Sequence, residues 1–187
     1  MGVVTPLRAS EAFTRADLDA LPDDGRRHEL LDGVLIVTPA PVPRHQRAQA
    51  RLLLALAPAC PPGLEIMMAP LDVVLAADTV LQPDLLVAAT ADFSDKDLPI
   101  TPRLAVEILS PSTRRFDLLI KRARYEAAGC PSYWIVDPDA PSLVAWELRD
   151  GAYVEAAHAV GDEVFTVASP FSVSLRPSDL VAVAGPG

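Results

Sequence analysis

The sequence predicts an α/β fold with a mixed β-sheet, because buried-strand signals and hairpin signals occur in one chain. Residues 103–110 (RLAVEILS) and 132–138 (SYWIVDP) are nearly continuous apolar runs, typical of strands buried on both faces, and a helical pattern separates them. Asp32-Gly33 and Asp150-Gly151 each interrupt strand-forming residues and are strong signals for antiparallel hairpins. Together these features favour a sheet that mixes parallel and antiparallel strands.

The first part of the chain is expected to contain helices and a hairpin. Residues 10–21 favour one or two short helices, with Ser10 or Thr14 available as the N-cap. Residues 26–41 predict two short strands around the first Asp-Gly turn. Residues 43–57 predict a helix that the following proline cluster ends. The apolar residues at helical spacing in this segment are Ala48, Leu52, Ala55 and Leu56.

The remaining elements follow from the same signals. Residues 65–76 and 79–89 predict further strands, and residues 92–97 an acidic surface loop. A helix is expected over residues 114–128, and residues 142–157 predict a hairpin. The boundary signals of that helix are Pro111, Ser112 and Thr113 at its start and Gly129 with Pro131 at its end.

Length and composition limit the class of protein. The chain has 187 residues, of which 50% are hydrophobic, so a folded globular protein is expected and a disordered one is not. Since no repeat, linker or low-complexity segment interrupts it, we expect a single domain over residues 1–187. No uncharged run reaches the roughly 18 apolar residues of a membrane span, and no secretory signal pattern opens the sequence. A cytoplasmic protein is therefore expected, and Cys60 and Cys130 indicate neither a zinc site nor a disulfide framework.

The net charge of −9 disfavours a nucleic-acid partner at first sight, because affinity for phosphates comes from lysine and arginine. The acidity is concentrated toward the C-terminus: residues 1–124 hold 14 Lys and Arg against 16 Asp and Glu, whereas residues 125–187 hold 2 against 9. Five basic residues also surround one acid, Asp117; they are Arg114, Arg115, Lys121, Arg122 and Arg124. This group is either a phosphate-facing patch or a solvated helix face.

Two carboxylates indicate a metal site. Asp84 follows a proline at the start of an apolar segment, and Glu107 lies inside the run 103–110, where burial of a charge is costly unless a partner or cation compensates it. Mg²⁺ or Mn²⁺ prefers oxygen ligands and needs only one or two carboxylates from a protein. Carried on neighbouring strands, Asp84 and Glu107 are the predicted metal ligands. Because side chains alternate along a strand, Leu109 should share a face with Glu107.

Taken together, the motifs resemble the Uma-type restriction endonuclease-like family of bacteria, within the PD-(D/E)XK nuclease superfamily. The resemblance runs in order through nearly the whole chain. It rests on HELLDG at 28–33, His45, QPDLLV at 82–87, AVEILSPST at 105–113, Asp117, Lys121, Tyr125 and GCPSYWIVDP at 129–138. In the superfamily a lysine usually stands two residues after the acid, where this chain has Leu109. The Uma-type pattern instead places a lysine on the following helix, at the position of Lys121.

The resemblance implies a restriction-endonuclease-like fold, with a mixed central sheet flanked by helices and added hairpins. It also implies a Mg²⁺- or Mn²⁺-dependent endonuclease that acts on DNA as a homodimer. Asp84 and Glu107 would bind the metal, and Glu29 would be a third acid that assists or orients. Lys121 would position or deprotonate the attacking water and stabilise charge on the phosphate.

Each residue also has a structural alternative. Asp84 could be a turn residue after a proline, and Glu29 could pair with an arginine across strands. Lys121 could pair with Asp117 on an exposed helix face, and His45 could be a surface residue at a helix start. Two other functions remain open: a nuclease-derived dimer that binds or regulates without cleaving, and hydrolysis of a small phosphate ester or nucleotide, which would lack steep salt dependence.

Overall fold

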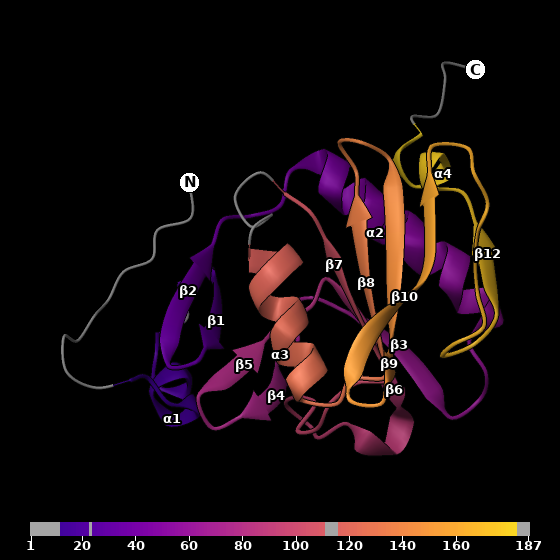
Figure 1. The fold of residues 1–187 in the computed structure, drawn as a ribbon. Coiled ribbons are helices and arrows are strands. Elements are labelled where there is room, and N and C mark those ends of the chain that lie inside the picture. The colour runs from indigo at the N-terminus through magenta and orange to yellow at the C-terminus, as the bar shows by residue number, and fades with distance from the viewer. Residues whose placement is uncertain (1–11, 23, 111–115, 183–187) are drawn as a thin grey trace.

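The computed structural model describes residues 12–22, 24–110 and 116–182, which form three sheets with helices around them (Figure 1). The largest sheet has six strands in the order β10-β9-β8-β7-β6-β3. In this sheet β7 and β8 are parallel, and the other neighbouring strands are antiparallel. The strands are β3 (Leu64–Met68), β6 (Leu85–Ala89), β7 (Leu104–Ile108), β8 (Ser132–Asp137), β9 (Ser142–Arg149) and β10 (Ala152–Val160). The predicted mixed sheet is confirmed.

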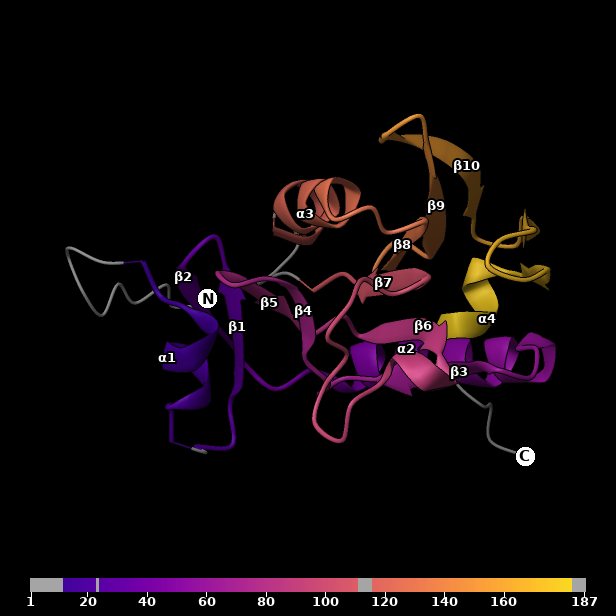
Figure 2. The same cartoon turned by 90° about the horizontal axis from the view of Figure 1, so that it is seen from below.

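A four-stranded antiparallel sheet in the order β2-β1-β5-β4 lies beside the large one (Figures 1 and 2). Its strands are β1 (Arg27–Leu31), β2 (Val34–Thr38), β4 (Val73–Ala76) and β5 (Thr79–Leu81). The turn from β1 to β2 has positive φ at both central residues, 51° at Asp32 and 75° at Gly33, as the predicted Asp-Gly hairpin requires. A two-stranded sheet, β11 (Phe165–Val167) with β12 (Val173–Leu175), was not predicted from the sequence.

Helices cover both faces of the six-stranded sheet, as Figure 2 shows for α2 (Pro43–Leu56) and α3 (Arg122–Ala127). Leu52 of α2 belongs to the same apolar cluster as Val106 and Ile108 of β7. Tyr125 of α3 belongs to a second cluster with Ala105 and Leu109. The remaining helical segments are α1 (Arg15–Asp19), η1 (Ala57–Ala59), η2 (Thr90–Asp92), the π-helix η3 (Phe116–Lys121) and α4 (Pro177–Val181).

The alternation along β7 fixes which face carries the predicted acid. Val106 and Ile108 pack on the α2 side, whereas Ala105 and Leu109 pack on the α3 side. Glu107 is therefore on the face covered by α3, together with Leu109, as the spacing predicts. Tyr133 and Trp134 of β8 are fully buried in the two clusters.

The two strands predicted over 65–76 and 79–89 are each divided in two. Pro70 lies between β3 and β4, and Pro83 lies between β5 and β6. A proline has no N–H to donate to a strand ladder, so each break is a place where the chain can leave one sheet for the other. The segment 82–84 is the second of these crossings, and it places Asp84 at the junction of the two sheets.

Two smaller expectations need correction. Ala55 is exposed, and the buried face of α2 instead includes His45 with Ala48, Leu52 and Leu56. The helix predicted over 114–128 is a π-helical segment followed by α3, and its predicted start lies outside the described residues. Thr14 caps α1 with a capping box, which agrees with the sequence, whereas Ser10 lies outside the described range. Within the described ranges no helix is long and apolar enough to cross a membrane.

Candidate active site

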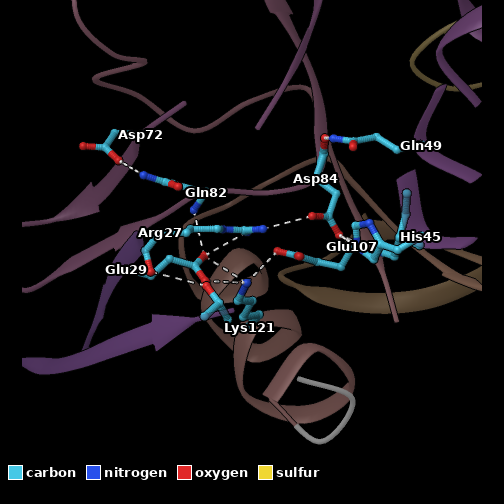
Figure 3. A network of polar contacts seen from close by, with 11 residues as sticks. Arg27, Glu29, His45, Gln49, Asp72, Gln82, Asp84, Glu107 and Lys121 are labelled. Atoms are coloured by element: carbon cyan, nitrogen blue, oxygen red, sulfur yellow. Dashed lines mark hydrogen bonds and ion pairs between the residues drawn. The ribbon is translucent and has the colours of Figure 1, made fainter. Parts of the chain in front are cut away.

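Five charged side chains meet where the two sheets join, and we name them the buried charge cluster: Arg27, Glu29, Asp84, Glu107 and Lys121 (Figure 3). The first two come from β1, and the others from the residue just before β6, from β7 and from the last residue of the π-helix. All four residues predicted as site residues from the sequence belong to this cluster. The fold thus brings together groups that are up to 92 residues apart in the chain.

Asp84 is held in its charged form by donors on every side. Leu85 pairs with Val106 in antiparallel register, so Asp84 lies next to Glu107 one step beyond the last paired positions. Its Oδ1 accepts from Arg27 Nη1 at 3.0 Å, and its Oδ2 accepts from the Ile108 N–H at 2.7 Å. Burial opposes ionisation, but the hydrogen bond from His45 and the charge of Arg27 outweigh it and lower the pKa of Asp84 to about 2.

Two residues one turn apart on α2 fix the position of Asp84. His45 Nε2 donates to Asp84 Oδ2 at 3.1 Å, and Gln49 Nε2 donates to the Asp84 carbonyl at 2.6 Å. His45 is only 7% exposed, so it is not a surface histidine. The helix therefore holds both the side chain and the backbone of this acid.

Lys121 and Glu29 form the core of the cluster. Lys121 Nζ lies 2.9 Å from Glu29 Oε1 and 3.2 Å from Glu107 Oε1, and the lysine is only 3% exposed. Lys121 is therefore buried and does not lie on an exposed helix face. Glu29 also accepts from the Gln82 N–H at 2.8 Å. Burial raises the pKa of Glu29, but the charges of Lys121 and Arg27 and this backbone hydrogen bond outweigh burial and lower it.

Glu107 is 1% exposed, so its charge depends on the neighbouring cations. Leu109, on the same strand face, is 3% exposed and packs with Leu31, Ile36 and Tyr125. An apolar side chain thus fills the position where the superfamily pattern has a lysine. The ammonium group next to Glu107 belongs instead to Lys121 of the π-helix.

Arg27 joins the carboxylates from the solvent side of the cluster. Its guanidinium donates to Asp84 and, at 3.4 Å, to Glu29. Burial works against its charge, but the charges of Glu29, Asp84 and Glu107 outweigh burial and raise its pKa. Its side chain is 23% exposed, compared with 5% or less for the other four members of the cluster.

Sequence reasoning did not find Arg27, Gln49 or Gln82. A period of two along β1 places Arg27 on the same face as Glu29, and a spacing of four along α2 places Gln49 beside His45. Both spacings can be read from the sequence, so Arg27 and Gln49 could have been predicted from it. The contribution of Gln82 is a backbone N–H, which no side-chain pattern reveals.

The predicted metal ligands were tested against the chemistry of a divalent cation. Within the described ranges no group of three or more His, Cys, Asp and Glu side chains forms a metal cage. Mg²⁺ needs only one or two carboxylates, however, and completes its octahedron with water and substrate oxygens. Asp84 and Glu107 lie side by side and are both buried, and carboxylate oxygens are the donors that such an ion prefers, so the donor set fits it.

The basic residues of 114–124 do not form one patch in the described part of the chain. Lys121 enters the buried charge cluster, while Arg124 Nε donates to Asp32 at 2.8 Å. Arg122 lies over the Trp146 ring, 5.1 Å from its centroid. Arg114 and Arg115 lie outside the described residues.

Comparison with solved structures first defines the class of fold. A structure described as a "putative nuclease belonging to DUF820", from Anabaena variabilis, matches with a TM-score of 0.71 and 19% sequence identity, over 90% of this chain and 97% of that one. The chain therefore has the restriction-endonuclease-like fold that the sequence predicts. No curated protein sequence matches it.

The family follows from the sequence itself. The Uma2 family, described as "Putative restriction endonuclease", matches residues 15–180, and the protein belongs to this family. The resemblance stated from the motifs is confirmed. The matched range includes every member of the buried charge cluster.

Proposed function

We propose that the protein is a divalent-metal-dependent endonuclease that hydrolyses phosphodiester bonds in DNA. One observation carries the proposal: Glu29, Asp84, Glu107 and Lys121, which lie far apart in the chain, converge in one buried cluster of a nuclease-like fold. Buried acids with a buried lysine are costly to assemble, and catalysis gives a reason for the arrangement.

In this proposal Asp84 and Glu107 hold Mg²⁺ or Mn²⁺. When bound, the ion supplies positive charge for the phosphate and makes water a better nucleophile. His45 and Gln49 keep Asp84 oriented, since both donate to it from α2. Lys121 positions the attacking water and stabilises charge on the phosphate, and Glu29 orients the ammonium group from 2.9 Å away.

The substitution Glu107→Gln tests the metal site. We expect Mn²⁺ affinity to fall by at least about tenfold, because a neutral amide oxygen is a much weaker ligand for a hard cation than a carboxylate. Titration calorimetry without nucleic acid measures this directly. Glu147→Gln, on β9 and 2.9 Å from Arg149, is the control, and its Mn²⁺ affinity should equal that of the wild type.

A comparison with Glu29→Gln separates the roles of the two acids. Glu29 is assigned to Lys121 and not to the metal, so this variant should lose turnover while keeping most of its Mn²⁺ affinity. Equal affinities in the wild type and Glu107→Gln would remove Glu107 from the metal site. A tenfold loss of affinity in Glu29→Gln would make Glu29 a metal ligand instead.

We further propose that the protein acts as a homodimer. Two sites related by a twofold axis suit cleavage of both strands of a duplex. The strand β10 supports an interface, because it is an edge of the six-stranded sheet and exposes Val154 (44%) and Val160 (50%). Sedimentation equilibrium at micromolar concentration should give twice the mass of the 187-residue chain, and a monomer mass would contradict the dimer.

A second candidate is a nuclease-fold protein that binds or regulates without cleaving. The tight ion pairing of the cluster favours it, since Lys121, Glu29 and Glu107 are each 3% exposed or less. Such a protein would bind DNA with the same affinity with and without Mn²⁺ and would produce no cleaved strands.

A further inference from the structure

Arg27 lies against Asp84, one of the two carboxylates that an added cation would need. Its guanidinium contacts Asp84 at 3.0 Å and Glu29 at 3.4 Å. The three carboxylates of the cluster face two cationic side chains, Arg27 and Lys121, so the five residues together carry one negative charge. If a divalent ion bound while Arg27 stayed in place, the charge of the cluster would change from one negative to one positive. Arg27 and the ion would then both lie against the Asp84 carboxylate.

Replacing Arg27 with a divalent ion gives a balanced site. Three carboxylates, the Lys121 ammonium and one divalent cation have no net charge, and charge balance is what a buried cluster requires. Lys121 is less suited to leave, because its side chain is 3% exposed and that of Arg27 is 23% exposed. Of the two cationic side chains, Arg27 is therefore the exchangeable one.

The position and bonding of Arg27 agree with an exchangeable group. Arg27 is the first residue of β1. The side chain of the preceding residue, Arg26, is 69% exposed, so solvent lies one residue away from Arg27 along the chain. The Nε atom of Arg27 is buried and has no hydrogen-bond partner among the described residues. A guanidinium has five N–H donors, and one left unpaired in the interior lowers the stability of the inward position.

We propose that Arg27 is an internal counterion that fills the metal position of the metal-free protein and is displaced outward when a divalent cation binds Asp84 and Glu107. This inference rests on the proposed metal-dependent function. The inward arginine stabilises the free carboxylates and lowers the apparent affinity for metal, because only the fraction of molecules with Arg27 outward is competent to bind. Arg27 thereby sets the metal concentration at which the site fills.

The decisive experiment is Mn²⁺ titration calorimetry of the full chain without nucleic acid. Arg27→Gln, which removes the competing charge, should bind Mn²⁺ at least about tenfold more tightly than the wild type. Arg27→Lys keeps a competing charge and should stay nearer to the wild type. Arg26→Gln makes the same charge change at an exposed neighbour and should leave the affinity unchanged.

The outcomes separate this inference from the proposed function. Mn²⁺ binding by both proteins with equal or weaker affinity in Arg27→Gln would overturn the counterion role and leave the metal site intact. No binding by either protein would overturn the metal site and the counterion role together.

A second measurement is made on the wild type, with Arg27→Lys used only for signal assignment, and does not depend on the folding of Arg27→Gln. The Arg27 Nε–H signal in a ¹⁵N NMR spectrum, assigned by its absence in Arg27→Lys, should exchange with water faster once Mg²⁺ is added, because the side chain moves into solvent. An unchanged exchange rate at saturating Mg²⁺ would show that the arginine stays inward and would overturn the proposal.

Discussion

Lys121→Ala should reduce turnover per folded molecule by about 10²-fold or more, the usual effect of removing a positioned acid-base or charge-stabilising group. The same change should also lower the free energy of unfolding by about 3–5 kcal/mol, because it leaves Glu29 and Glu107 buried without their shared partner. Single-turnover cleavage at saturating Mn²⁺ and chemical denaturation measure the two effects separately.

The chain provides a matched control for this variant. Lys96 is 62% exposed and pairs with Asp19, so Lys96→Ala should change stability by less than about 1 kcal/mol and leave the rate unchanged. If Lys121→Ala loses stability but cleaves at the wild-type rate, Lys121 is a structural ion-pair partner and has no role in the reaction.

A double variant distinguishes a missing ammonium group from a damaged fold. Leu109 shares a strand face with Glu107, so Leu109→Lys combined with Lys121→Ala would return an ammonium group to the position usual in the superfamily. Partial recovery of the rate would show that both positions serve one site. Recovery of neither rate nor stability would mean that the apolar neighbours of residue 109 do not admit the lysine.

Asp84→Asn should abolish cleavage and destabilise the protein. The carboxylate accepts from Arg27, His45 and the Ile108 N–H, and an amide would turn its own N–H₂ toward one or more of these donors. We expect a loss of about 2–4 kcal/mol in the free energy of unfolding, the scale for losing hydrogen bonds to a buried charge. Asp139→Asn, at a side chain that is 53% exposed, should have little effect on either property.

The pH dependence of the difference in stability between the wild type and Asp84→Asn identifies its cause. The pKa of Asp84 is lowered to about 2 in the folded protein, compared with about 3.9 for an ordinary aspartate. Its charge therefore contributes stability above pH of about 4, and that contribution is lost as the pH falls toward 2. The wild type should approach Asp84→Asn in stability over this range, and a difference that is constant with pH would mean that the lost packing, not the charge, is responsible.

Much of the fold was predictable because its signals are local. The buried strands β7 and β8, both Asp-Gly hairpins and the helix α2 follow from composition and period over a few residues each. The division of 65–76 and 79–89 into separate strands was missed, although each segment contains the proline that divides it. β11 and β12 have three residues each, too few for a period to be recognised.

Four of the five members of the buried charge cluster were predicted from the sequence, but Arg27 and the electrostatics of the cluster were not. Burial of Glu107 follows from its apolar neighbours in the sequence, and Lys121 follows from the resemblance. Two acids predicted on neighbouring strands are expected to repel each other, whereas Asp84 in the folded protein is surrounded by donors that hold its pKa low. The reasons are the hydrogen bond from His45 and the charge of Arg27. Arg27 reaches Asp84 across 57 positions of the chain, a contact set by the junction of the two sheets and by no local pattern.

The π-helix Phe116–Lys121 makes the site sensitive to chain length as well as to composition. A π-helical turn contains one residue more than an α-helical turn of the same backbone, and each residue of a helix turns the chain by about 100°. If the same residues formed an α-helix instead, Lys121 would rotate about the helix axis and away from Glu29 and Glu107. A chain one residue shorter would need that α-helical turn to keep the lysine in place. The length of this segment and its helix type are thus coupled, and a change in one without the other would separate Lys121 from its partners with every acid and base of the site still encoded.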